Sequence, residues 1–237
     1  MCADSESLMK KNNKIQIIPA VMPQDYEDLV EHAAMFVGLV PYIQLDIMDG
    51  KFVPGVTWPH VPGDQHFKRI ETEEEGMPQW ESIDFEVDLM IVNPEHWVPR
   101  WVLAGARRII VHVESMRDFE LIRESVPVGN IELGLAINTT TPLSAVEPYL
   151  DRIDFIQCMG IEKIGFQGQS FDGRVIEHIK TIRARLPEMP ISVDGSVNFE
   201  TAQSLVDAGA TRLVSGSAIL ENDDVGGAIR ELQNLVQ

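Results

Sequence analysis

The feature that most constrains this fold is a repeated alternation of short apolar segments with longer amphipathic ones. Apolar and β-branched residues predict strands at Ile15–Ala20, Tyr42–Asp46, Asp84–Met90, Arg108–His112, Glu132–Ile137, Arg152–Cys158, Pro190–Asp194 and Arg212–Ser215. Amphipathic segments predict helices at Tyr26–Phe36, Pro94–Ala104, Arg174–Leu186 and Phe199–Ala208. This alternation favours a parallel sheet covered by helices, and about eight units match the size of a (β/α)8 barrel.

An open doubly wound sheet is the competing architecture. It usually carries a glycine-rich turn after its first strand, whereas this chain continues there as "VMPQDYEDL", without glycine. We therefore predict an α/β protein with a single (β/α)8 TIM barrel over residues 15–237, preceded by a flexible N-terminal segment, residues 1–14.

The charge balance excludes some classes of partner. The 237 residues include 19 Lys and Arg against 37 Asp and Glu, a formal charge of −18, which repels nucleic acid and anionic membranes. The two cysteines, Cys2 and Cys158, do not suggest a disulfide. The polar N-terminus does not resemble a secretory signal, and no apolar run is long enough to span a membrane, so we expect a cytoplasmic protein.

Side-chain alternation predicts which residues face the barrel interior. In "YIQLDIM", Ile43, Leu45 and Ile47 share the face expected to meet the helices. The opposite face, here and on three other strands, carries most of the polar residues; its members are Gln44, Asp46, Met48, Glu86, Asp88, Met90, Ile110, His112, Glu114, Ser192 and Asp194. His112 is interpreted as a hydrogen-bonded interior histidine, and a contribution to the site is the alternative.

Three acids and one amide lie near the C-terminal ends of these strands, where such barrels place their chemistry. Gln44, Asp46, Asp88 and Asp194 are therefore expected to converge. Either a divalent cation neutralises them, or one carboxylate keeps a proton through a raised pKa. A cluster of satisfied polar groups around buried water is the structural alternative.

Small residues after the last two strands suggest a phosphate site. "VDGSVN" and "VSGSAI" offer backbone N–H groups where barrels commonly bind phosphate. The candidate residues are Gly195, Ser196, Gly216 and Ser217. The loop "GFQGQSF", which contains Gly168, is a third flexible segment that could close over a ligand.

Seven segments, in order along the chain, resemble the ribulose-phosphate 3-epimerase family. They are "LDIMDGKFVPGVTW", "VDLMIVNPEHWV", "AGARRIIVHVES", "LGLAINTTTPL", "IGFQGQSF", "ISVDGSVNFETA" and "AGATRLVSGSAI". The resemblance implies a sugar-phosphate epimerase or isomerase that interconverts ribulose 5-phosphate and xylulose 5-phosphate. Two aspartates, matching Asp46 and Asp194 here, would transfer protons on opposite faces of the substrate through an enediolate.

The same resemblance implies a divalent metal and a methionine-lined pocket. Met48, Met90 and Met159 match the pocket residues, although they also suit a core. The metal ligands would be Gln44, Asp46, Asp88 and Asp194, an oxygen-only set that favours Mg²⁺ or Mn²⁺ over Zn²⁺. We expect no organic cofactor. Family members often form homo-oligomers.

The chain departs from the family pattern at several functional positions. Gln44 and Asp88 stand where the family has metal-binding histidines, Ala20 replaces a serine, and Ser196 replaces a glycine. An Asn-Pro-Gly-Phe run is replaced by "EKIGF". A non-catalytic sugar-phosphate-binding descendant is therefore the alternative function. A related barrel lyase is a weaker one, since its Asp-x-Lys pattern is missing and Lys51 is the only nearby substitute.

Overall fold

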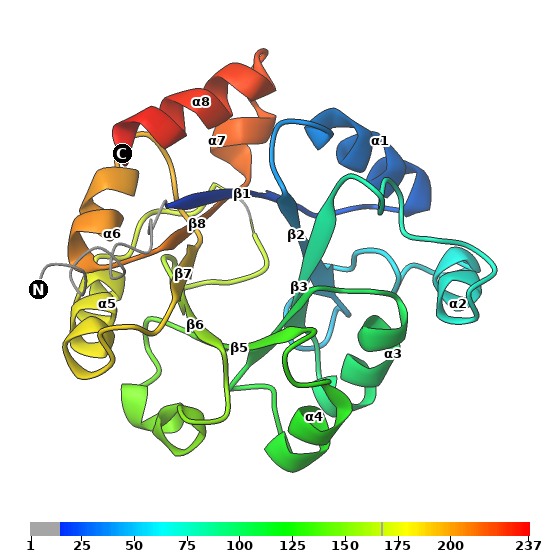
Figure 1. Ribbon diagram of the computed structural model, residues 1–237, viewed down its shortest axis with the longest axis horizontal. Coiled ribbons are helices and arrows are strands. Elements are labelled where there is room, and N and C mark those ends of the chain that lie inside the picture. The colour runs from blue at the N-terminus through cyan, green and yellow to red at the C-terminus, as the bar shows by residue number, and fades with distance from the viewer. Residues whose placement is uncertain (1–14, 167) are drawn as a thin grey trace, which may run out of the picture.

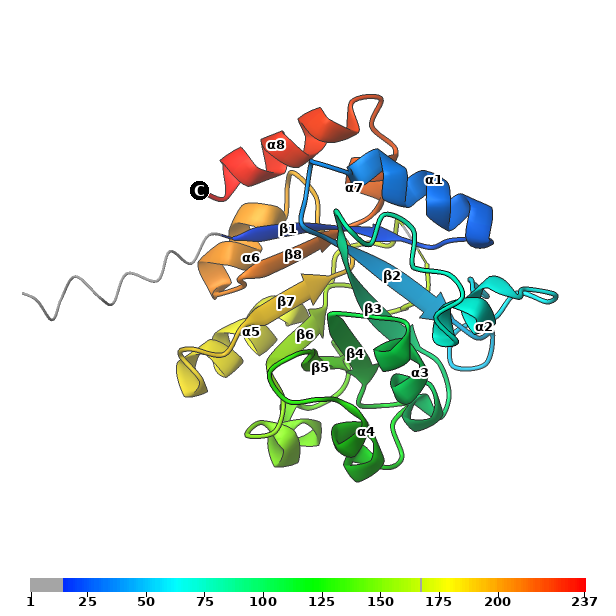
Figure 2. The ribbon, with the colours of Figure 1, turned by 45° about the vertical axis from the view of Figure 1, so that its right-hand side comes forward.

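The computed structural model describes residues 15–166 and 168–237, so the predicted flexible segment 1–14 lies outside the described residues. Eight parallel strands pair in chain order, and β1 closes the ring against β8. Figure 1 shows the strands at the centre with helices around them, and Figure 2 shows the barrel turned by 45°. The predicted TIM barrel is confirmed, and the open doubly wound sheet is wrong.

The strand positions agree closely with those expected from the sequence. They are β1 (Gln16–Val21), β2 (Tyr42–Met48), β3 (Asp84–Met90), β4 (Arg108–His112), β5 (Glu132–Ile137), β6 (Phe155–Met159), β7 (Ile191–Asp194) and β8 (Arg212–Ser215). The largest difference is at β6, because Arg152, expected to begin this strand, lies in the bend that precedes it.

Helices and short 3-10 turns connect the strands. They are α1 (Tyr26–Phe36), α2 (His66–Glu71), η1 (Pro94–His96), α3 (Val98–Leu103), α4 (Phe119–Ser125), η2 (Leu143–Ala145), η3 (Glu147–Tyr149), α5 (Arg174–Arg185), α6 (Ala202–Ala208), α7 (Ser217–Leu220) and α8 (Val225–Leu235). The helix predicted over Pro94–Ala104 is divided into η1 and α3. Pro99 has no N–H to continue the helical hydrogen bonding across this boundary.

Strand alternation separates an outer core from the barrel interior, as predicted. Ile43, Leu45 and Ile47 belong to the large cluster between strands and helices, whereas Met48 packs with the interior residues Met90 and Met159. The β2–β3 register pairs Asp46 with Asp88 and Met48 with Met90. The polar and sulfur-containing side chains of β2 and β3 are therefore neighbours inside the barrel.

Four charged residues at the starts of their strands form what we call the N-terminal charge cluster: Glu86, Arg108, Glu132 and Arg212. Arg108 Nη1 donates to Glu86 Oε2 at 2.9 Å, and Arg212 Nη2 donates to Glu132 Oε2 at 2.6 Å. The Arg212 guanidinium lies over the Phe155 ring, 4.7 Å from its centroid. A Cβ at Gly134 would come within 2.4 Å of that ring, so glycine makes room for it.

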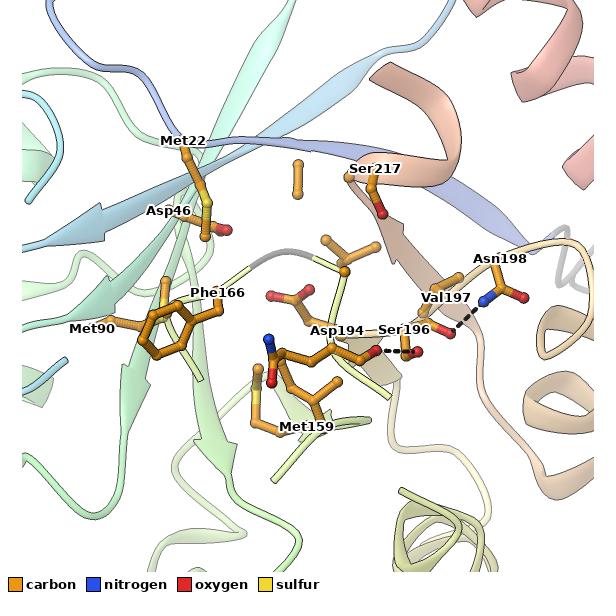
Figure 3. A pocket seen from close by; sticks show the side chains of 18 residues that line it. Met22, Asp46, Met90, Met159, Phe166, Asp194, Ser196, Val197, Asn198 and Ser217 are labelled. Atoms are coloured by element: carbon orange, nitrogen blue, oxygen red, sulfur yellow. Dashed lines mark hydrogen bonds between the residues drawn. The ribbon is translucent and has the colours of Figure 1, made fainter. Parts of the chain in front are cut away.

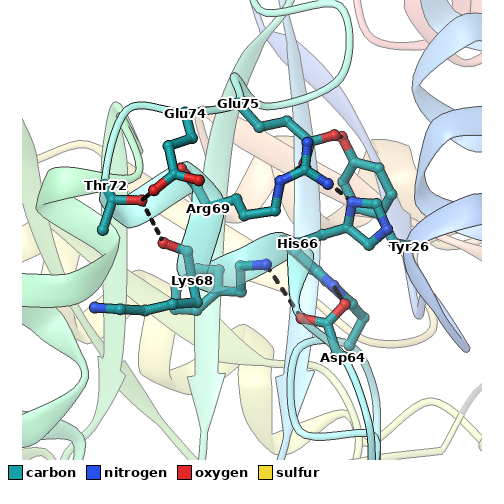
Figure 4. Close-up of polar contacts among 10 residues, drawn as sticks. Tyr26, Asp64, His66, Lys68, Arg69, Thr72, Glu74 and Glu75 are labelled. Atoms are coloured by element: carbon teal, nitrogen blue, oxygen red, sulfur yellow. Dashed lines mark hydrogen bonds and ion pairs between the residues drawn. The ribbon is translucent and has the colours of Figure 1, made fainter.

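Side-chain contacts hold the long connection between β2 and β3 against α1. Tyr26 donates to Glu75 at 2.9 Å, and its ring stacks on His66 with centroids 3.9 Å apart (Figure 4). His66 Nδ1 also lies 3.0 Å from Glu75. Within the described part of the chain, no helix is long and apolar enough to cross a membrane.

Candidate active site at the C-terminal mouth of the barrel

A cavity of about 210 Å³ opens at the carboxyl ends of the strands. Its lining combines acids, methionines and small residues: Ala20, Met22, Asp46, Met90, Met159, Ile161, Gly165, Phe166, Gly168, Gln169, Asp194, Gly195, Ser196, Val197, Asn198, Val214, Gly216 and Ser217. Figure 3 shows Asp46 and Asp194 reaching it from different strands, with Met90 and Met159 nearby. No arginine or lysine is among these lining residues.

Gln44 joins the two aspartates that line the cavity. Its Nε2 donates to Asp46 Oδ1 at 2.9 Å and to Asp194 Oδ2 at 2.8 Å. Asp88 is close as well, because one carboxylate oxygen from each of the three acids lies within 4.8 Å of the others. We call Asp46, Asp88 and Asp194 the acid cluster. The structure thus brings together all four residues that the sequence predicts to converge.

Asp88 has different partners from the other two acids. Its Oδ1 lies 3.0 Å from His112 Nε2 on β4, an ion-pair contact without the alignment of a hydrogen bond. Its Oδ2 accepts a hydrogen bond from Gln157 Nε2 on β6 at 3.1 Å. Asp88, His112 and Gln157 are all fully buried. The acid cluster is therefore held by two separate sets of donors.

Burial and mutual repulsion favour the protonated form of the cavity acids. Burial, followed by the charges of Asp194 and Asp88, raises the pKa of Asp46 well above its usual value. Burial and the charge of Asp88 raise the pKa of Asp194 to about 7. The two carboxylates repel each other and share the Gln44 amide, so near neutral pH the site is expected to retain a proton between them. Such a pair offers one acid and one base.

His112 brings the only cationic group in contact with this cluster among the described residues. Burial alone would lower its pKa, but Asp88 and Glu114 together raise the pKa of His112 to about 10. Burial would raise the pKa of Glu114, and His112 instead holds it at about 2. A protonated His112 offsets one negative charge of the acid cluster. The sequence-based interpretation of His112 as an interior residue is correct. Its contact with Asp88 makes it part of the site.

The acid cluster has the chemistry of a site for a hard divalent cation. Carboxylate and amide oxygens are the ligands that Mg²⁺ and Mn²⁺ prefer. Gln44 Oε1 is a buried oxygen without a hydrogen-bond donor among the described residues. This free acceptor, beside three converging carboxylates, fits such an ion.

The predicted phosphate residues lie together on another side of the cavity. Gly195, Ser196, Gly216 and Ser217 all line it, as does Gly168 of the β6–α5 loop. Ser196 has a φ of +56°, in the left-handed region that favours glycine. Its Oγ donates to the Gln169 carbonyl at 2.9 Å, so it links the β7–α6 loop to the β6–α5 loop.

Not every expected residue reaches the cavity, and some lining residues were not anticipated. Met48 is buried in the adjoining apolar cluster rather than on the cavity surface. Lys51 is exposed and does not line the cavity, which gives the lyase alternative no support. Met22 and Phe166 line the cavity, although the sequence does not predict either as a site residue. Gln157 could have been found, because strand alternation in "FIQCM" directs this residue inward.

The fold and site define a class: a (β/α)8 barrel with a small acid-lined cavity at its C-terminal mouth. Residues 16–220 match the model of the ribulose-phosphate 3-epimerase family, so the chain belongs to that family. It is 31% identical to ribulose-phosphate 3-epimerase from Bacillus subtilis, with 92% of this chain and 98% of the relative aligned. Identity to the chloroplastic ribulose-5-phosphate-3-epimerase of Arabidopsis thaliana is also 31%, covering 92% and 76%.

Solved structures of more distant proteins share the barrel. 3-Hexulose-6-phosphate synthase from Salmonella typhimurium superposes with a TM-score of 0.67 at 14% identity, covering 94% of this chain and 98% of that one. Orotidine 5'-phosphate decarboxylase from Pyrococcus horikoshii gives 0.60 at 18%, covering 93% and 99%. At these identities the likeness establishes the fold alone.

Proposed function

We propose that this protein is a sugar-phosphate epimerase that inverts the carbon next to a ketose carbonyl, with ribulose 5-phosphate as the first substrate to test. The observation that carries the proposal is the pairing of Asp46 and Asp194 at one cavity, both bonded to Gln44 Nε2. The family supports the reaction class, because its named relatives are ribulose-phosphate 3-epimerases.

The proton transfers follow from the shared proton of the two acids. The ionised carboxylate removes the proton from the substrate carbon, and the protonated partner delivers one from the other side. The raised pKa values of Asp46 and Asp194 make both states accessible near neutral pH. After one turnover the two roles are exchanged, which suits a reversible epimerisation.

A cation bound by Asp46, Asp88 and Asp194 would offset negative charge that develops on the substrate oxygens. Gln44 positions the two proton-transferring carboxylates through its amide N–H groups. Ser217 borders the cavity with a hydroxyl, and the backbones of Ser196 and Ser217 offer N–H donors for a phosphate. With no basic side chain in the lining, neutral donors would carry this contact.

The test is conversion of ribulose 5-phosphate to xylulose 5-phosphate by the purified chain, with Mg²⁺, Mn²⁺ or Zn²⁺ supplied in turn. We expect turnover that is greatest with Mg²⁺ or Mn²⁺ and lost in Asp46→Asn. Ser192→Ala, a buried substitution on β7 that does not line the cavity, is the matched control. Lack of turnover with every metal, on this substrate and on hexulose phosphates, would exclude an epimerase.

A binding protein without catalysis is the second candidate. It is favoured by the two departures at the acid cluster, Gln44 and Asp88, at positions where the family resemblance places histidines. A thermal shift assay with the same sugar phosphates separates the two functions. Stabilisation by a sugar phosphate without any turnover would support binding alone, whereas turnover abolished by Asp46→Asn would exclude it.

A further inference from the structure

We propose that His112 and Gln157 are positioning residues that hold Asp88 in the acid cluster and thereby set the affinity of the site for a divalent cation. This inference rests on the proposed function, since it concerns the same cluster. It goes further by assigning roles to two side chains outside the cavity lining.

The two oxygens of Asp88 are fixed from two different strands. His112 Nε2 lies 3.0 Å from Oδ1, and Gln157 Nε2 donates to Oδ2 at 3.1 Å. Contacts at both oxygens restrict the rotation and tilt of the carboxylate. Gln44 does not share this task, because its Nε2 is bonded to Asp46 and Asp194. The position of Asp88 is thus set independently of the proton-transferring pair.

The positioning groups are themselves held in place. His112 is fully buried, its Nδ1 lies 3.8 Å from Glu114 Oε2, and the Phe52 ring packs with its centroid 5.6 Å away. Glu114 in turn accepts a hydrogen bond from the Asn138 backbone at 2.9 Å. A supported imidazole on β4 therefore reaches across to the carboxylate on β3.

Such support matters because a buried carboxylate without partners adopts whichever rotamer reduces repulsion from its neighbours. Asp46 and Asp194 both repel Asp88, and loss of a donor would let Asp88 turn away from them. Residues that orient a metal ligand typically change metal affinity by about 10–100-fold when replaced. We expect effects of that size at His112 and Gln157, neither of which lines the cavity.

The experiment measures Mn²⁺ binding to the full chain by the free-ion signal in electron paramagnetic resonance, without substrate. Gln157→Met removes the donor at similar volume, His112→Leu removes the imidazole, and Asp88→Asn removes the charge. Gln157→Met and Asp88→Asn should each weaken Mn²⁺ binding about 10-fold or more. His112→Leu should weaken it as well, because the lost support of Asp88 outweighs the lost repulsion between the imidazolium and the ion. His112→Gln, which restores an N–H donor, should bind more tightly than His112→Leu, and Ser192→Ala should bind as the wild type does.

Unchanged Mn²⁺ affinity in Gln157→Met and His112→Leu, with a loss in Asp88→Asn, would overturn the proposal. So would a wild-type chain that binds no Mn²⁺. Turnover of ribulose 5-phosphate is scored separately, so a failed binding test and a failed epimerase proposal are distinguishable. If His112→Leu does not fold, as judged by circular dichroism, Gln157→Met decides the outcome.

Discussion

Two clusters of charged residues lie at opposite ends of this barrel, and they differ in how their charge is balanced. The N-terminal charge cluster pairs Glu86 with Arg108 and Glu132 with Arg212. The acid cluster at the other end gathers three carboxylates within 4.8 Å. Ion pairing compensates the first cluster, whereas the second retains excess negative charge beside a cavity. We interpret the N-terminal charge cluster as support for the fold and the acid cluster as a site for a ligand or a proton.

The largest expected difference concerns activity. Replacing Asp46 by Asn removes one of the two groups that we propose to transfer protons, so turnover should fall by about 10²–10⁴-fold. The folded state should be as stable as the wild type or more so, because a repelling buried acid becomes neutral. Steady-state kinetics and urea unfolding measure the two properties. Loss of activity together with a large loss of stability would show that the acid cluster, like the N-terminal charge cluster, supports the fold.

At the N-terminal charge cluster we expect a loss of stability with the properties of the cavity retained. Arg108→Met leaves Glu86 buried without its partner, which should cost about 3–5 kcal/mol of the free energy of unfolding. The sugar-phosphate affinity of the fraction that remains folded should be unchanged, since Arg108 does not line the cavity. Urea unfolding checks the first expectation and calorimetric titration the second. A variant of wild-type stability would show that these pairs are dispensable.

The acid cluster should also make the free energy of unfolding depend on pH. The pKa of Asp194 is raised to about 7 in the folded state by burial and by Asp88. The folded state therefore holds a proton that the unfolded chain releases near pH 4, and stability should fall as pH rises from about 4 to 7. At about 1.4 kcal/mol per pKa unit, the loss reaches at most about 4 kcal/mol.

Urea unfolding in EDTA across that pH range tests this expectation. Asp194→Asn should show a smaller decline than the wild type over pH 4–7, since its amide does not titrate. His112, with its pKa raised to about 10, contributes its own decline only above about pH 6.5, where its unfolded form begins to lose the proton. Parallel curves for wild type and variant would contradict a strained acid cluster.

The smallest expected effects lie at the cavity rim. Ser196→Gly relieves a left-handed backbone worth about 1–2 kcal/mol but loses the hydrogen bond to Gln169, worth about 1 kcal/mol. Net stability should change by about 1 kcal/mol or less. Ser196→Ala keeps the backbone strain and loses the bond, so it should be the less stable of the two. Hydrogen exchange around Gln169 should speed up in both variants.

Much of this molecule is predictable because strand side chains alternate. Apolar, β-branched segments give the eight strands, and alternation gives the inward direction of Gln44, Asp46, Asp88 and Asp194. Contacts across the barrel are less accessible from sequence, since the Gln157–Asp88 bond joins residues 69 positions apart. Local sequence patterns do not specify side-chain rotamers, so they do not show that Gln44 donates to both Asp46 and Asp194. They also do not specify loop paths, on which the hydrogen bond from Ser196 to Gln169 depends.

The most direct test of the central claim is deuterium exchange at C3 of ribulose 5-phosphate in heavy water, followed by NMR. A proton-transferring Asp46–Asp194 pair predicts that the wild type with Mg²⁺ or Mn²⁺ forms xylulose 5-phosphate with deuterium at C3, and that this product is lost in both Asp46→Asn and Asp194→Asn. Exchange that survives unchanged in both variants, or no exchange with any metal, would contradict the claim.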